Sequence, residues 1–135
     1  MSTPVLVDTS AWVEYLRATG SKHDHALGRA LQSQDSVLMP AVVLQELLQG
    51  ARSPQHYMAL QKALETVDLF EPQDWGHLHA QAGLLYARCR WQGLTVRNPI
   101  DCVVAACALE AELPLLARDT DFAHLQRVAP QLHLL

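Results

Sequence analysis

The stretch that decides the fold is "LPLLARDTDF", residues 113–122, where a short apolar run is followed at once by Asp119 and Asp121. A short apolar run bounded by polar residues is consistent with a buried strand. The stretch "TPVLVD", residues 3–8, has the same form and ends in Asp8. The carboxyl ends of neighbouring parallel strands lie about 4.8 Å apart at one edge of a sheet. We therefore expect the three acids to gather at that edge.

Length and composition predict one globular domain spanning residues 1–135. The chain is half apolar and has a net charge of −4, and a core of this size needs no disulfide or structural metal. We expect no signal peptide and no membrane span. Cys89, Cys102 and Cys107 are odd in number and form no CxxC pair, so they are interpreted as buried thiols of a cytoplasmic protein.

Short apolar runs alternate with stretches of helical periodicity along the whole chain. The runs predict strands at residues 3–8, 36–40, 67–70, 113–117 and 131–135. The periodic stretches predict helices at residues 9–18, 23–32, 40–51, 53–67, 72–93, 98–112 and 120–126. This alternation indicates an α/β fold: a single three-layer domain with a central, mainly parallel, short-stranded sheet flanked by helices.

Two of the predicted helices have recognisable starts and faces. Pro40 and Pro72 are each expected to open a helix, because proline suits the first helical position. The helix from Pro72 carries one apolar stripe, formed by Trp75, Leu78, Ala82, Leu85 and Cys89. This stripe is expected to face the core or a second copy of the chain.

Two further acids lie on helices that point at the same edge. Asp101 occupies the third helical position if Asn98 is the N-cap, which places it near the helix start. Glu46 lies six residues beyond Pro40, about 9 Å into its helix. Helical side chains lean toward the helix N-terminus, so a glutamate at this position can still reach the edge.

The crowding of these carboxylates predicts a metal site. Like charges brought together repel one another, and burial raises their pKa, unless cations neutralise them. Mg²⁺ and Mn²⁺ prefer such all-oxygen surroundings. Bound there, they could polarise a phosphodiester and lower the pKa of a bound water.

Each acid also has a purely structural interpretation, which the sequence leaves open. Asp8 can cap the helix that begins near Thr9, and Asp119 or Asp121 can cap the short helix after them. Asp101 and Asn98 form a variant of the capping box. Glu46 can be an ordinary residue at the boundary of an amphipathic helix.

Four stretches of the chain form a set with a characteristic order and spacing: "VLVDTSAWVEYL", "LQELLQGA", "GLTVRNPIDCVVAACALE" and "LPLLARDTDF". In these stretches the chain resembles the PIN domain family, particularly VapC-type toxins of bacterial toxin–antitoxin pairs. The resemblance implies a Mg²⁺- or Mn²⁺-dependent ribonuclease that cleaves RNA, forms a homodimer and is held inactive by a cognate antitoxin.

The resemblance also implies roles for particular residues. Four acids match the family's catalytic and metal-binding quartet: Asp8, Glu46, Asp101 and Asp119. Asp121 is a possible accessory metal ligand. Thr9 and Ser10 match the hydroxyl-bearing residues that orient water or metal in the family.

Basic residues and histidines around these stretches have competing interpretations. Arg52, Arg97 and Arg118 could hold RNA phosphates, although Arg118 could equally balance Asp119. The seven histidines show no zinc-site spacing, so structural or surface roles are expected for them.

Three other functions fit the sequence less well. A receiver-type signalling domain needs a lysine after a late strand, and Lys22 and Lys62 are the only lysines. A phosphohydrolase with a DxD nucleophile carries that motif on its first strand, whereas residues 119–121 come near the end. A catalytically silent PIN-like interaction domain is opposed by the complete acidic quartet.

Overall fold

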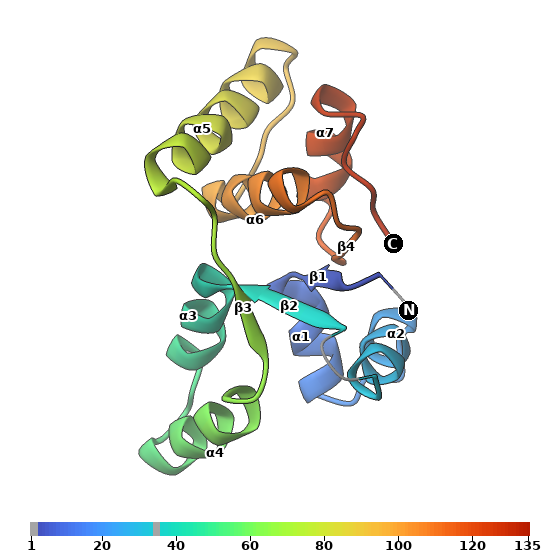
Figure 1. Ribbon diagram of the computed structural model, residues 1–135, viewed down its shortest axis with the longest axis vertical. Coiled ribbons are helices and arrows are strands. Elements are labelled where there is room, and N and C mark those ends of the chain that lie inside the picture. The colour runs from blue at the N-terminus through green and yellow to red at the C-terminus, as the bar shows by residue number, and fades with distance from the viewer. Residues whose placement is uncertain (1–2, 34–35) are drawn as a thin grey trace.

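The core of the fold is one parallel sheet of four strands in the order β3-β2-β1-β4 (Figure 1). The structure is a computed structural model and describes residues 3–33 and 36–135. Its strands are β1 (Val5–Val7), β2 (Val37–Pro40), β3 (Asp68–Phe70) and β4 (Leu115–Leu116). Leu6 of β1 is in register with Leu38 on one side and with Leu115 on the other. The strands that precede Asp8 and Asp119 are therefore neighbours, as predicted.

Helices cover both sides of this sheet. They are α1 (Thr9–Leu16), α2 (Lys22–Leu31), α3 (Ala41–Gln49), α4 (Pro54–Leu64), α5 (Trp75–Trp91), α6 (Pro99–Ala111) and α7 (Asp121–Val128). Helix α6, with α5 and α7 packed on it, lies on one side, and α1, α2 and α3 lie on the other (Figure 1). The three-layer α/β architecture expected from the sequence is confirmed.

Helix α6 is the central helix of the fold. Ala105 and Ala108 on it are 0% and 1% exposed, because their small side chains allow close packing. All three cysteines are buried free thiols, as expected. Burial raises the pKa of Cys102 and of Cys107 to about 12, so neither thiol is a nucleophile at neutral pH. Among the described helices, none is long and apolar enough to cross a membrane.

The predicted helix start at Pro72 is wrong, and the predicted start at Pro40 is one residue early, whereas the helices expected from residues 53 and 98 do begin with Pro54 and Pro99. Helix α5 begins at Trp75, because the Asp74 side chain caps it by accepting a hydrogen bond from the His77 N–H. Trp75 is consequently half exposed and does not belong to the buried stripe, which Leu78 and the three later members form. Pro40 ends β2 and occupies the N-cap position of α3 rather than its first turn.

The predicted strand at residues 131–135 is reduced to a single parallel bridge, between Leu134 and Leu115. The Leu115 N–H donates to the His133 carbonyl at 2.8 Å, and the Leu135 N–H donates to the Leu115 carbonyl at 2.9 Å. The Leu132 carbonyl accepts a hydrogen bond from the Gln126 side chain of α7 at 2.8 Å. Strand β4 itself has two residues, and Ala117 already lies outside it.

Candidate metal centre

Asp8 lies at the junction of β1 and α1 and is 2% exposed. Its Oδ2 accepts hydrogen bonds from the Ser10 N–H at 3.0 Å and from the Ser10 hydroxyl at 2.6 Å. The predicted N-cap role is thus confirmed for this oxygen. Its Oδ1 is buried without any partner. Burial raises the pKa of Asp8, and the nearby charge of Glu46 adds to the effect.

Glu46 reaches the same edge from the second turn of α3. The Thr9 hydroxyl donates to its Oε1 at 2.6 Å. The Asn98 side-chain amide lies 3.4 Å from its Oε2. The glutamate therefore joins α3, the start of α1 and the start of α6.

Asp101 is a second buried acid of the group and is 4% exposed. Burial, followed by the charge of Asp8, raises its pKa to about 9, and a hydrogen bond to the Asp121 side chain contributes. Its Oδ2 is buried without a partner. The predicted capping box is wrong, because the Asn98 N–H donates to Asp121 and not to Asp101.

Asp119 and Asp121 complete the cluster from the segment that follows β4. Oxygen atoms of Asp101, Asp119 and Asp121 all lie within 4.8 Å of one another. Asp119 is exposed, and its Oδ1 accepts the Asp121 N–H at 2.9 Å. Neither acid caps α7, whose N-cap is Thr120 with no side-chain hydrogen bond.

Asp121 has a larger structural role than the sequence indicated. It is 2% exposed, and its Oδ2 accepts the backbone N–H groups of Arg97 at 2.9 Å and Asn98 at 3.1 Å. These contacts hold the start of α6, and with it Asp101, against the start of α7. No local pattern predicts this role, because the partners lie more than 20 residues away in the chain.

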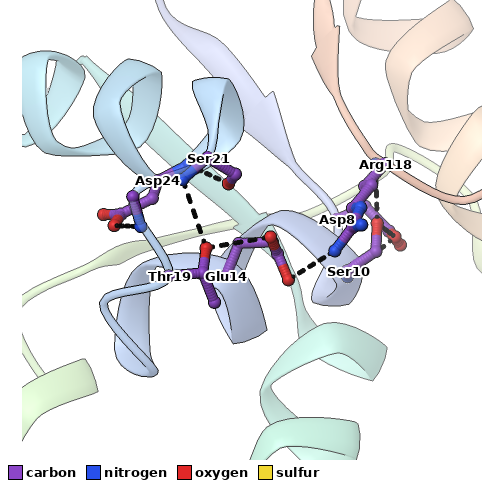
Figure 2. A network of polar contacts seen from close by, with 8 residues as sticks. Asp8, Ser10, Glu14, Thr19, Ser21, Asp24 and Arg118 are labelled. Atoms are coloured by element: carbon purple, nitrogen blue, oxygen red, sulfur yellow. Dashed lines mark hydrogen bonds and ion pairs between the residues drawn. The ribbon is translucent and has the colours of Figure 1, made fainter.

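A polar network fastens the Asp119 segment to α1 (Figure 2). The Arg118 N–H donates to the Ser10 hydroxyl at 2.9 Å, and the same hydroxyl donates to Asp8. The Arg118 guanidinium pairs with Glu14 at 2.7 Å, and Glu14 also accepts from the Thr19 hydroxyl at 2.9 Å. One arginine thus makes two contacts with α1 next to a candidate ligand.

These contacts change the interpretation of the basic residues. The Arg118 side chain pairs with Glu14 and not with Asp119. The prediction that Arg118 balances the charge of Asp119 is therefore wrong. Arg52 and Arg97 are exposed. Among the described residues, no histidine belongs to a group that could hold a metal ion.

The arrangement fits a hard cation. Two buried carboxylate oxygens, one on Asp8 and one on Asp101, lack hydrogen-bond partners. Unpartnered buried carboxylate oxygens are costly, and a divalent cation is a suitable partner for them. The candidate ligands that lie together are Asp101, Asp119 and Asp121. Asp8 and Glu46 lie outside that group, although the charge of Asp8 acts on Asp101.

Comparison with known proteins identifies relatives over almost the whole chain. The family model described as "PIN domain" matches residues 5–128. "Ribonuclease VapC11" of Mycobacterium tuberculosis is 34% identical over 125 residues, which cover 92% of each protein. A DNA-bound VapBC structure from Salmonella typhimurium has a TM-score of 0.75 at 17% identity and covers 99% of this chain and 98% of that chain. VapBC-5 of Mycobacterium tuberculosis, a member of the VapBC family of toxin–antitoxin systems, has a TM-score of 0.68 at 22% identity, with 99% and 98% covered.

Proposed function

The chain belongs to the PIN domain family, and from this membership we propose that it is a metal-dependent endoribonuclease, the toxin of a toxin–antitoxin pair. Its 34% identity to a named VapC ribonuclease supports RNA as the substrate. We take residues 1–135 as one PIN-like domain. The observation that carries the proposal is the buried acidic cluster, whose unpartnered oxygens are suited to a hard cation.

Asp101, Asp119 and Asp121 would hold Mg²⁺ or Mn²⁺, with Asp8 and Glu46 in support. The ion would polarise the phosphodiester and lower the pKa of a bound water to near neutrality. The chain's own residues orient the carboxylates. Ser10 fixes one oxygen of Asp8 and leaves the other free, and Thr9 fixes one oxygen of Glu46.

Asp101 must lose a proton before it can bind a cation, because its pKa of about 9 keeps it protonated at neutral pH. Asp101 would release this proton to solvent when a divalent cation binds beside it, because a nearby positive charge favours the ionised carboxylate. Until that happens, the carboxyl can donate its proton to Asp121. The cluster therefore avoids like-charge repulsion in the metal-free protein.

The antitoxin is proposed to cover the acidic edge. A cavity of about 220 Å³ lies beside Glu46, and Leu16, Leu47 and Leu60 are among the residues that line it. An antitoxin segment with an apolar residue followed by arginine or lysine would fill this cavity and pair with the acids. The homodimer expected from the resemblance remains a prediction.

Cleavage of total RNA by the purified chain tests the proposal. We expect no cleavage after thorough chelation and recovery on addition of Mg²⁺ or Mn²⁺. Asp119→Asn should remain inactive at every metal concentration, whereas Asp68→Asn, an exposed acid on β3, should behave as wild type. Cleavage that survives chelation would refute the metal mechanism. Failure of the protein encoded beside this chain to bind it at micromolar concentration would refute the antitoxin assignment.

A further inference from the structure

The end of α5 and the connection to α6 carry positive charge that the proposed chemistry leaves unused. Residues 75–100 contain Arg88, Arg90 and Arg97 but no Asp or Glu, in a chain of net charge −4. All three arginines are exposed. The ion pair that the described residues contain is that of Arg118 with Glu14, so these three arginines have no acidic partner.

Trp91 lies within the same segment and is 70% exposed. It follows the buried Cys89 by two residues, which places it about 200° around the helix from the face that packs on the core. An indole in this position contributes nothing to the core. It offers a flat apolar face to a ligand.

The segment leads from Trp91 directly to the metal centre. Gly93, at φ +74, turns the chain out of α5. The His124 Nδ1 then lies 3.1 Å from the Thr95 carbonyl, which fastens the connection to α7. At its end, the Arg97 N–H donates to Asp121. Figure 1 shows the connection running from the end of α5 to the start of α6.

We propose that this segment, residues 90–97, is the track along which single-stranded RNA approaches the metal centre. Trp91 stacks on a base, and Arg90 and Arg97 bind phosphates of the same strand. The inference rests on the proposed ribonuclease function. An acidic centre repels the RNA backbone except where a cation is bound. The affinity for RNA must therefore come from positively charged side chains elsewhere that contact its phosphates. Proteins that bind single strands usually combine positive charge along the path of the strand with exposed aromatic side chains on which bases stack.

The test is the binding of a fluorescent 12-nucleotide single-stranded RNA to the full chain, measured by anisotropy in chelator at several salt concentrations. Trp91→Ala should weaken binding about 5- to 160-fold without changing the salt dependence, and Trp91→Phe should restore most of the affinity. Removing Arg90 and Arg97 together should make the slope of log affinity against log salt shallower by about 1.4. Arg29→Ala, an exposed arginine on α2, is the matched control and should change affinity less than about twofold.

Two results would overturn the track. One is wild-type affinity and salt slope in all the track variants. The other is a loss of the dimer in Trp91→Ala by light scattering, restored by Trp91→Leu, with RNA affinity constant throughout. The surface would then join two copies of the chain. The ribonuclease proposal can fail separately. If the wild-type chain binds RNA through these residues but cleaves none with any cation, the ribonuclease function is refuted and the RNA track is not.

Discussion

The replacement of Asp101 by asparagine tests the electrostatics of the centre most sharply. The two side chains have the same shape, and the asparagine amide can donate to Asp121 as the protonated Asp101 carboxyl does. The variant therefore removes a titrating group and leaves the packing in place. Without metal, the Asp101→Asn variant should be more stable than the wild type at neutral pH.

The magnitude follows from the pKa of Asp101, which is 3.8 in the unfolded chain and about 9 in the folded one. Because the folded pKa is the higher, the stabilisation is complete below pH 3.8 and is lost as the pH rises toward 9. The loss is about 1.4 kcal/mol per pH unit. Between pH 5 and pH 7 the wild type therefore loses on the order of 3 kcal/mol that the asparagine variant does not lose.

The assay is urea unfolding of both proteins in chelator at pH 5 and at pH 7. The stability gap should widen by about 3 kcal/mol in favour of Asp101→Asn. A gap that stays constant within about 0.5 kcal/mol would show that Asp101 is an ordinary solvated carboxylate, and the reasoning would fail. With Mg²⁺ at one hundred times its Kd, the wild type should gain about 2.7 kcal/mol, and the variant should lose most of that gain.

Three further substitutions examine the groups that position the acids. Glu14→Gln should weaken Mn²⁺ binding several-fold, because Arg118 loses its ion-pair partner. Asp24→Asn, at the outer edge of the same network, is the control and should leave the Mn²⁺ affinity unchanged. Equal Mn²⁺ affinities of Glu14→Gln and wild type would show that Glu14 does not support the site. Asp121→Ala should lower the free energy of unfolding by about 2–5 kcal/mol because two backbone N–H groups lose their acceptor, and Asp121→Asn should recover most of it in the same urea experiment. Ser10→Ala should lower kcat about tenfold with little change in KM for RNA, because Asp8 loses the hydroxyl that orients it; a change confined to KM would contradict this role.

The sequence predicts the parts of this molecule that depend on local pattern. The runs that form β1 and β2 are apolar and end in recognisable polar or proline residues, and Asp8 follows β1 at the edge of the sheet. The position of Glu46 at that edge is also predictable, because side chains in any α-helix lean toward the helix N-terminus. The sequence pattern alone predicts the start of α5 at Pro72, because Pro72 and Asp74 are both helix start signals. The hydrogen bond from the His77 N–H to the Asp74 side chain decides for the later start.

Long-range contacts are what the sequence does not predict. Asp121 holds the backbone at Arg97 and Asn98, and Arg118 pairs with Glu14 across more than 100 residues. In the sequence, Asp121 is an accessory to Asp119 and Arg118 is a phosphate ligand or a counter-charge. Only the packing of α7 against α6, and of the segment after β4 against α1, makes these partners neighbours.

The central claim is that the acidic edge holds the divalent ion on which RNA cleavage depends. One Mn²⁺ titration tests it directly, with protein-bound metal followed by electron paramagnetic resonance and RNA cleavage measured on the same samples. The cleavage rate of the wild type should rise in proportion to metal occupancy. The Asp119→Asn variant should lose occupancy and rate together. Cleavage at zero occupancy, or an Asp119→Asn variant that binds Mn²⁺ and cleaves RNA as the wild type does, would contradict it.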